Sequence, residues 1–381
     1  MFNCRDFYNL LDKNGIRFYC GVPDSLLKDF CAFIEANISP EKHIITANEG
    51  NAIALAAGVF LSTKNPGLVY MQNSGEGNAL NPLVSLVDEN VYSIPVLLLI
   101  GWRGEPNIKD EPQHIKQGKI TLSLLDTLDI PYSILPENIN DAEKIINKAF
   151  STMMEKNRPY ALIVKKGTFE QYKNNIIDSC IYELSREDTI KIIVDNMSKL
   201  DVCVSTTGMT SRELFEYRKF KNQDNASDFL TVGSMGHSSS IALGIALNKP
   251  ERQVFCIDGD GAAIMHLGAL TTIGTKAPEN FKHIIINNGA HDSVGGQDTA
   301  GFKIDFCKIA QACGYNKTLV ANNKNELEQS LNIIKDSKGP SLLEVRIKKG
   351  ARKDLGRPTK SPIENKIEFM EFLGAKCKTN L

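Results

Sequence analysis

The sequence has no excess of charge of either sign, no long hydrophobic run and no recognisable leader. Its 44 basic and 45 acidic side chains give a formal net charge of −1, so no global basic field attracts nucleic acid or an acidic membrane. The longest apolar run, residues 94–100, is far below the ~20 residues that span a bilayer. Charged residues interrupt positions 1–13, unlike a secretory signal. We therefore expect a cytoplasmic protein that binds neither nucleic acid nor a membrane.

Two familiar motifs are also missing. The nine cysteines are scattered from Cys4 to Cys377 without a C-x-x-C pair. Several, including Cys20, Cys203 and Cys256, end or interrupt apolar runs, which predicts buried free thiols. No G-x-G-x-x-G follows an apolar run, and this absence disfavours a dinucleotide site of that kind.

What the chain does contain is typical of two globular domains. Its 381 residues are 42% hydrophobic and 23% charged, and that length is too great for one core. Apolar runs without strict alternation predict buried parallel strands at 17–20, 43–46, 67–71, 95–100, 132–135, 160–164, 202–205, 229–232, 253–257, 283–286 and 341–347. Stretches of 3.6-residue periodicity predict helices at 25–35, 51–61, 142–155, 188–199 and 324–334. The alternation predicts an α/β fold class with two doubly wound parallel sheets.

The domain boundary is predicted in the polar stretch 165–185, where periodicity is lost. It separates a domain of residues 1–170 from one of residues 186–381, each about the size of one Rossmann-like domain. A basic segment with only one acid follows the last predicted strand, and Pro362 then begins a terminal helix that runs to Phe372.

The strongest chemical motif lies in the second half. Gly259-Asp260-Gly261 follows an apolar run, and Asn288 follows the next one. The glycines allow backbone to approach an anion at a strand end, while Asp260 and Asn288 offer hard oxygen ligands that suit Mg²⁺ and a diphosphate. A simple tight turn would explain a lone Gly-Asp-Gly. The second run and its asparagine, at strand–helix–strand spacing, favour the metal–diphosphate site.

This motif resembles that of the thiamin-diphosphate-dependent enzymes. The resemblance implies Mg²⁺ bound by Asp260, Asn288 and the backbone carbonyl of Ala290, with Ala262 beside the diphosphate motif. It also implies that Met235 props the cofactor into a bent shape, although methionine fills core gaps anywhere. Thr210 and Ser211 fit a helix start that holds the diphosphate, and a plain N-cap explains them equally well.

Glu49 is the corresponding candidate in the first half. It stands at a predicted helix start and is followed by small residues that permit close helix packing. Most first-turn glutamates only interact with the helix dipole. The resemblance makes Glu49 the acid that hydrogen-bonds the aminopyrimidine ring, chemistry that needs a buried carboxyl.

Further motifs narrow the resemblance to the phosphonopyruvate decarboxylase family, with sulfopyruvate decarboxylases as close relatives. They are GVPDS at 21–25, QNSGEGNALNP at 72–82, GWRGEP at 101–106, DEPQHIKQG at 110–118 and NGAHDSVGGQ at 288–297. The resemblance covers nearly the whole chain. It implies a pyrimidine-binding domain, then a diphosphate-binding domain, without a middle domain. It also implies a homo-oligomer with active sites between subunits, and decarboxylation of 3-phosphonopyruvate, a 2-keto acid with an anionic C3 group, in phosphonate biosynthesis.

Substrate and proton-transfer residues are less strongly indicated. Ser25 and Asp24 match a substrate position, and either could be a helix cap. His114, in a polar loop, His237 and His291 are the proton-transfer candidates, whereas His43, His266 and His283 begin strands or lie in a helix and are interpreted as structural. Asp258 is either a turn cap or a neighbour supporting Asp260. The phosphonate needs cations, for which Arg103, Arg352 and Arg357 are candidates, with Lys109 and Lys360 behind them. A solvated charge run is the alternative for the tail.

Competing functions remain at this point. Sulfopyruvate decarboxylase differs only in the C3 head group. A carboligase needs room for a second substrate that the short chain does not offer. A non-catalytic diphosphate binder would have no use for a buried acid at Glu49.

Overall fold

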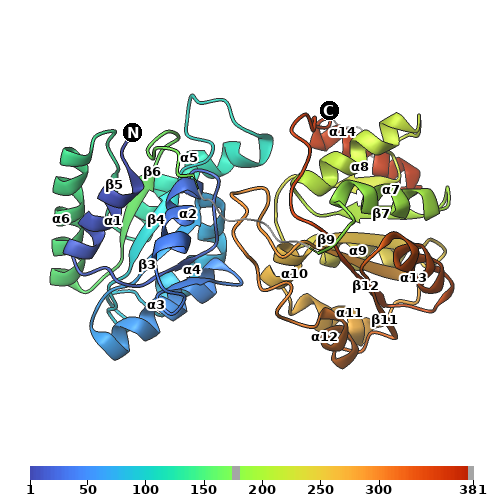
Figure 1. Cartoon of the computed structure of the whole chain (residues 1–381), viewed down its shortest axis with the longest axis horizontal. Helices are drawn as coiled ribbons and strands as arrows, with labels where there is room; N and C mark the ends of the chain where they lie inside the picture. The colour runs from blue at the N-terminus through green and yellow to red at the C-terminus, as the bar shows by residue number, and fades with distance from the viewer. Residues whose placement is uncertain (174–180, 376–381) are drawn as a thin grey trace. The chain divides into compact units, whose positions relative to one another are not determined.

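The computed structural model describes residues 1–173 and 181–375 and divides into two units, Met1–Ile177 and Asp178–Leu381. The division falls inside the stretch 165–185, part of which, 174–180, lies outside the described residues. Each unit contains a six-stranded, all-parallel sheet with helices on both faces (Figure 1). The predicted fold class, two doubly wound sheets with no middle domain, is confirmed.

The sheet of the first unit has the spatial order β2-β1-β3-β4-β6-β5. Its strands are β1 (Tyr19–Gly21), β2 (His43–Ile45), β3 (Leu68–Gln72), β4 (Leu97–Gly101), β5 (Tyr132–Ile134) and β6 (Tyr160–Val164). The helices are α1 (Cys4–Lys13), α2 (Lys28–Asn37), α3 (Glu49–Thr63), the short 3₁₀ helix η1 (Asn73–Gly75), α4 (Glu76–Ser85), α5 (Pro112–Thr127) and α6 (Ile139–Lys156).

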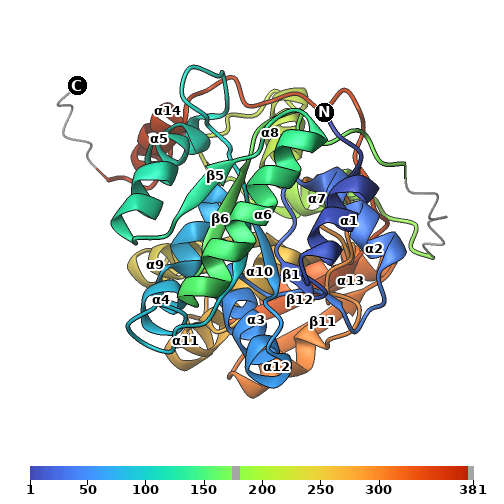
Figure 2. The same ribbon diagram turned by 90° about the vertical axis from the view of Figure 1, so that its left-hand side faces the viewer.

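Alternate strand residues supply two cores in this unit. Leu97 and Leu99 join the core covered by α1, α2 and α6, and Leu98 and Ile100 join the core covered by α3, α4 and α5. Helices α1 and α6 lie side by side on the first of these faces (Figures 1 and 2). Because β4 is buried on both faces, its sequence is continuously apolar.

The sheet of the second unit has the order β11-β12-β10-β9-β7-β8. Its strands are β7 (Val202–Ser205), β8 (Asp228–Leu230), β9 (Val254–Gly259), β10 (Phe281–Asn287), β11 (Lys317–Ala321) and β12 (Ser341–Arg346). Its helices are α7 (Arg186–Asn196), α8 (Met209–Phe220), α9 (Ser238–Asn248), α10 (Asp260–Met265), α11 (Ala269–Lys276), α12 (Phe306–Ala312), α13 (Lys324–Asp336) and α14 (Pro362–Phe372).

The two sheets share one topology. Counted from its own first strand, each has the order 2-1-3-4-6-5. In both sheets the second strand lies on one side of the first strand and the third strand lies on its other side. This reversal of direction creates a switch point at the carboxyl ends of the strands. Open α/β sheets bind ligands at such points. The segments that follow β1, β3 and β4, and β7, β9 and β10, are therefore the places to look for a site.

Capping residues explain where two helices begin. Ser185 and Ser361 each form a capping box, with Asp188 and Glu364 respectively. Pro362 occupies the first turn of α14, where its missing N–H costs nothing. The predicted terminal helix is confirmed.

All eleven predicted strands are present, and none of their ends differs from the prediction by more than two residues. The sequence analysis missed β11, an edge strand whose residues are mostly only half-buried. The seven described cysteines are free thiols, and Cys20, Cys203 and Cys256 are buried as predicted. None of the helices in the described part of the chain combines the length and apolar composition needed to cross a bilayer.

Candidate active site

Glu49 is the buried acid at the start of α3. Asn48 caps this helix by accepting a hydrogen bond from the Asn51 backbone N–H. The Asn78 side-chain amide, from α4, donates to Glu49 Oε2 at 2.7 Å. An added Cβ at Gly75 would collide with the Glu49 carboxyl, so that position needs glycine. Burial raises the pKa of Glu49, and the Asn78 bond opposes this in part. The carboxyl is thus poised to hold and share a proton.

Glu76, which the sequence analysis did not nominate, is a second buried acid in this unit. It begins α4 and is 3% exposed, and its Oε1 has no hydrogen-bond partner among the described residues. Burial raises its pKa to about 8, against the opposing effect of a hydrogen bond with Thr121. The sequence did contain a signal for Glu76. Gly75-Glu76-Gly77 follows β3, the third strand of the first unit in chain order, much as Gly259-Asp260-Gly261 comes at the end of β9, the third strand of the second unit.

Replacing Glu76 with glutamine is expected to flatten the pH dependence of the unfolding free energy. Burial raises the pKa from 4.5 to about 8, so between these values the native state holds a proton that the unfolded state releases. This contribution to stability is fully present below 4.5 and is lost as the pH rises through 8. Within the window the wild type should lose up to ~1.4 kcal/mol per pH unit relative to Glu76→Gln, as measured by urea unfolding.

The matched control for this experiment is Thr121→Val, which removes the hydroxyl partner but keeps the carboxyl. It should retain the wild-type slope. Parallel pH profiles for the wild type and Glu76→Gln would contradict the assignment of the slope to Glu76.

Asp24, Ser25 and Arg103 form one hydrogen-bonded group after β1 and β4. Asp24 is fully buried and accepts from the Gln72 side chain at 2.6 Å and from the Leu26 N–H at 2.8 Å. Burial raises the pKa of Asp24, and these bonds oppose the shift. Arg103 Nη1 donates to Ser25 Oγ at 2.8 Å. The structure therefore brings the two residues predicted to face the substrate carboxylate together with an arginine predicted to bind the phosphonate.

Asp110 fixes the Arg103 guanidinium. Arg103 Nε and Nη2 donate to the two Asp110 carboxylate oxygens at 2.8 and 2.5 Å. Although burial opposes ionisation, the bonds from Arg103 and from backbone N–H groups hold the pKa of Asp110 below its usual value. With the Ser25 bond, three of the five guanidinium N–H groups are used within the described residues, and two remain for a ligand.

His114 was predicted to lie in a polar loop, and this prediction is wrong. The residue lies in the first turn of α5 and is buried. Its backbone packs so tightly against Gly104 that a Cβ there would collide with the His114 carbonyl. Gly104 has φ of +70°, which also requires glycine. The segment after β4 is thus locked onto the start of α5.

Asp260 and Asn288 meet at the carboxyl ends of β9 and β10. Asp260 begins α10, is buried, and accepts from the Thr299 hydroxyl and from the Asn288 backbone N–H. Burial raises its pKa to about 6, and these bonds oppose the shift. Asn288 Oδ1 accepts from the Ala290 N–H at 3.0 Å, and its Nδ2 donates to Asp292 at 2.7 Å. Two predicted metal ligands, Asp260 and Asn288, are therefore in direct contact, and the third, Ala290, is bonded to Asn288.

The glycines around Asp260 have different surroundings. A Cβ at Gly259 would meet nothing within 4 Å, so this backbone is open to a ligand. A Cβ at Gly261 would lie 3.0 Å from His291 Cε1. His291 is half-buried, and burial lowers its pKa to about 4, which keeps it neutral at physiological pH. Ala262 is buried in α10.

The remaining candidates of this unit lie near the ends of β7 and β8. Ser211 bonds Ser205 Oγ at 2.6 Å and the Thr206 carbonyl at 2.8 Å, so its hydroxyl is used within the unit. Thr210 is buried beside it. Met235 is half-buried. His237 is exposed, and its ring centroid is 4.3 Å from that of His266.

The two tail arginines differ in their contacts. Arg352 forms ion pairs with Glu187 and Asp354, each at 3.2 Å, and with Glu216. Arg357 is exposed. A cavity of about 280 Å³ adjoins Arg352 and is lined by Met209, Arg212, Asp292, Gly350, Ala351, Arg352, Lys353 and Leu355. Asp292 links this cavity to Asn288.

Comparisons with known proteins match a different family profile to each of the two units. The family profile "Thiamine pyrophosphate enzyme, N-terminal TPP binding domain" matches residues 5–124, and the profile "Thiamine pyrophosphate enzyme, C-terminal TPP binding domain" matches residues 206–345. The chain is 31% identical to a phosphonopyruvate decarboxylase of Streptomyces viridochromogenes, with 98% of this chain and 95% of that protein covered. For a phosphonopyruvate decarboxylase of Streptomyces hygroscopicus the figures are 32%, 98% and 94%. For a sulfopyruvate decarboxylase of Methanosarcina acetivorans they are 29%, 96% and 96%.

Proposed function

The chain belongs to the thiamine pyrophosphate enzymes and is a thiamin-diphosphate-dependent 2-keto acid decarboxylase of the phosphonopyruvate and sulfopyruvate type, and from this premise we propose that it decarboxylates 3-phosphonopyruvate to phosphonoacetaldehyde with the help of Mg²⁺. The observation that carries the choice of substrate is the similarity to two phosphonopyruvate decarboxylases along nearly their whole length. The reaction would serve phosphonate biosynthesis.

The residues at the ends of β9 and β10 fit a Mg²⁺ ion that carries a diphosphate. The Asp260 carboxylate, the Asn288 amide oxygen and the Ala290 carbonyl are hard oxygen donors, which Mg²⁺ prefers. Burial disfavours the charge on Asp260, and a cation would compensate for it. The open backbone at Gly259 leaves room for diphosphate oxygens. Gly261, Ala262, Thr210 and Met235 complete the proposed cofactor contacts, and Ser211 is the weaker member of this set because its hydroxyl already bonds Ser205 and Thr206.

Glu49 is the proposed acid for the cofactor's aminopyrimidine ring. Thiamin diphosphate supplies, when bound, a nucleophilic carbon for the 2-keto group and an electron sink for the electrons released with CO₂. A buried carboxyl with a raised pKa can share a proton with a ring nitrogen, and Asn78 holds the Glu49 side chain in one orientation.

Each unit contains candidates for proton transfer or for binding the substrate carboxylate. His291 is neutral at physiological pH because burial lowers its pKa, so it can accept a proton beside Gly261. His237 and His114 are the other proton-transfer candidates. Asp24, protonated more readily because it is buried, and Ser25 are proposed to face the substrate carboxylate.

Arg103 is the proposed phosphonate ligand. Asp110 orients its guanidinium, and two N–H groups remain available. Arg352 already has three carboxylate partners, so among the tail cations it is the weaker candidate. Arg357 stays a proposal because the phosphonate needs cations and because glycines and prolines punctuate the basic segment, unlike a simple charged helix.

Replacing Arg103 with alanine is expected to raise the KM for phosphonopyruvate about 10- to 100-fold, since charge-assisted hydrogen bonds contribute ~1.5–3 kcal/mol. The KM of Arg103→Lys should lie between those of the wild type and Arg103→Ala, because lysine keeps the positive charge but lacks the forked pair of N–H donors. Arg158→Ala is the matched control, because its guanidinium bonds Glu89 at 2.8 Å. Arg158 precedes the amino end of β6, whereas Arg103 follows the carboxyl end of the neighbouring strand β4. An unchanged KM for Arg103→Ala would move the phosphonate site to the tail, where Arg352→Ala and Arg357→Ala would test it.

A homo-oligomer with active sites between subunits is proposed on the basis of the family and of the exposed apolar surface on α3 and α4. Leu61 on α3 and Leu80 and Val84 on α4 are exposed. These two helices pack together and begin with Glu49 and Glu76. Burying this face in an interface would also shield the site from water.

The function is tested by measuring CO₂ release from phosphonopyruvate, sulfopyruvate and pyruvate, each with and without thiamin diphosphate and Mg²⁺. The proposal expects the highest kcat/KM for phosphonopyruvate and no release without the cofactor. A higher kcat/KM for sulfopyruvate would assign the second activity instead, which the similarity to the Methanosarcina enzyme supports.

A further inference from the structure

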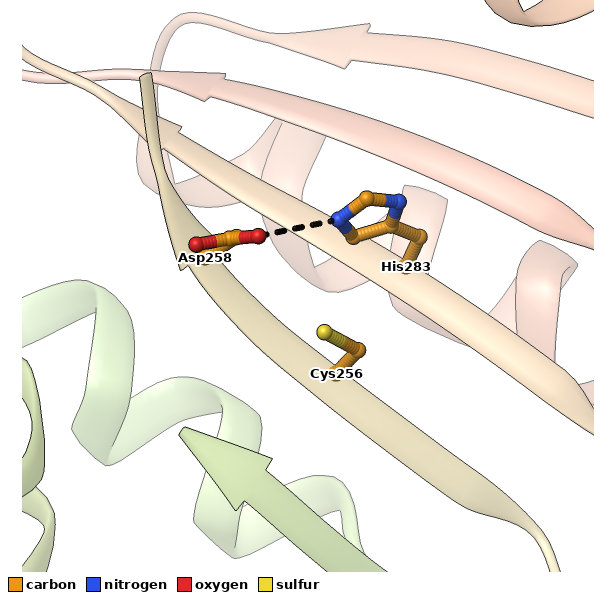
Figure 3. A group of neighbouring side chains, drawn as sticks. All are labelled: Cys256, Asp258 and His283. Carbon is orange, nitrogen blue, oxygen red and sulfur yellow. Dashed lines mark ion pairs between the residues drawn. The ribbon is translucent and has the colours of Figure 1, made fainter. Parts of the chain in front are cut away.

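Three potential metal ligands meet on one face of the second sheet, on the neighbouring strands β9 and β10. Cys256 and Asp258 are two residues apart on β9, so their side chains lie on the same face. His283 pairs with Cys256 in the parallel register of β10 and β9. Figure 3 shows the Asp258 carboxylate and the His283 ring facing each other with the Cys256 thiol beside them. All three residues are buried.

The separations suit a shared ion better than a direct bond. His283 Nε2 lies 3.7 Å from Asp258 Oδ2, beyond the length of a hydrogen bond. The sulfur, nitrogen and oxygen atoms all lie within 4.8 Å of one another. Tetrahedral zinc, with bonds of about 2.0–2.3 Å, separates its ligand atoms by roughly 3.3–3.8 Å. Asp258 Oδ2 and His283 Nε2 already have this spacing, and a small rotation of the Cys256 side chain would bring its sulfur to a ligand position as well.

Both facing atoms lack a partner. Asp258 Oδ2 and His283 Nε2 are buried and make no hydrogen bond within the described residues. Each side chain is only 1% exposed, so bulk water does not satisfy them. A buried polar atom left unpaired is costly, and two such atoms that face each other indicate an ion or water between them.

Neighbouring groups hold two of the ligands in place. The Tyr315 hydroxyl lies 3.3 Å from His283 Nδ1 and fixes the ring with Nε2 toward the cluster. The Gly259 N–H donates to Asp258 Oδ1 at 3.2 Å, which leaves Oδ2 directed at His283. Hydrogen bonds of this kind from outside the ligand set are typical of metal-binding histidines and carboxylates.

We propose that Cys256, Asp258 and His283 bind a Zn²⁺ ion. A thiolate, an imidazole and a carboxylate form a mixed donor set that suits zinc and not the oxygen-seeking Mg²⁺. The site goes beyond the proposed function, because it uses neither Asp260 nor the cofactor. Bridging β9 and β10, the ion would hold together the two strands whose ends carry Asp260 and Asn288.

The test measures metal in the full-length protein, purified from zinc-supplemented medium and passed through a desalting column without Mg²⁺ or thiamin diphosphate. Mass spectrometry of the metals should find about one zinc per chain. Protein loaded with Co²⁺ instead should show the near-ultraviolet charge-transfer absorption of a cobalt–thiolate bond. Cys256→Ala should lose both signals. Asp258→Asn, which preserves volume, should bind zinc at least ~10-fold more weakly and serves as the second variant if Cys256→Ala fails to fold.

The matched control is Cys203→Ala. Cys203 is an equally buried thiol on the neighbouring strand β7, but it belongs to the core on the opposite face of the sheet. It should retain zinc and the cobalt absorption. Two results would overturn the proposal: wild-type protein from zinc-supplemented medium that contains no zinc, or Cys256→Ala and Asp258→Asn variants that bind zinc with wild-type affinity. Either result would assign the space between Asp258 and His283 to water. Because these readouts need no substrate or cofactor, they stand or fall separately from the decarboxylase activity.

Discussion

Glu49→Gln is expected to lower the decarboxylation rate by about 10²- to 10⁴-fold while thiamin diphosphate still binds. Glutamine keeps the shape of the side chain and can still accept the bond from Asn78, but its amide has no ionisable proton that it could transfer to a ring nitrogen. The fold should not suffer, since burial already disfavours the charged carboxyl. Steady-state kinetics give the loss of turnover, and calorimetric titration with thiamin diphosphate and Mg²⁺ gives the cofactor affinity.

A direct readout separates this role from a structural one. The rate of hydrogen–deuterium exchange at the reacting carbon of bound thiamin diphosphate should fall together with kcat. Glu76→Gln is the matched control, because it also neutralises a buried acid at a helix start in the same unit, and it should keep turnover within a few-fold of wild type. If Glu49→Gln exchanged at the wild-type rate, Glu49 would have no part in the reaction. The distinction between this protein and a non-catalytic diphosphate binder would then be lost as well.

Most of the fold was predictable because parallel strands buried on both faces have a distinctive sequence. β6 and β7 begin and end where their apolar runs do. β11 was not predicted, because an edge strand is covered less and Lys317 at its start is exposed. Helix α9 was also missed: Ser238 to Asn248 is rich in small and apolar residues without a clear polar face, so periodicity gave no signal.

The candidate site was predictable where its residues are close in sequence to strand ends. Asp260 and Asn288 each follow a strand directly, and adjacent parallel strands place them together. The partners of Arg352 were not predictable in this way. Glu187 and Glu216 come from α7 and α8, far from the tail in sequence, and only the folded unit brings them to the guanidinium.

Glu76 illustrates a different limit. Its sequence surroundings differ little from those of Glu49, since both acids open helices after strands of the same sheet. Whether such an acid is solvated or buried depends on what packs over the helix start, here Thr121 from α5. Burial of a particular side chain is a tertiary property that a local motif does not encode.

Asp260→Asn is expected to weaken the binding of thiamin diphosphate in the presence of Mg²⁺ by more than ~100-fold, because it replaces an anionic ligand with a neutral one. The metal-free protein should unfold within about 4 °C of wild type, since asparagine has the same shape and avoids the cost of burying a charge. Cofactor titration at fixed Mg²⁺ and thermal unfolding without Mg²⁺ therefore separate lost binding from lost folding.

A graded comparison then shows whether Asp260 is a ligand or only a neighbour of one. Asp292→Asn leaves Asp260 and Asn288 intact and alters the carboxylate that accepts from Asn288, from the Gly350 N–H and from Arg186, with which it also forms an ion pair. A change outside the ligand set typically costs 10- to 100-fold in metal affinity, so this variant should fall between wild type and Asp260→Asn. Equal affinities for Asp260→Asn and Asp292→Asn would mean that both act by positioning Asn288, and the metal would have to be assigned elsewhere in the second unit.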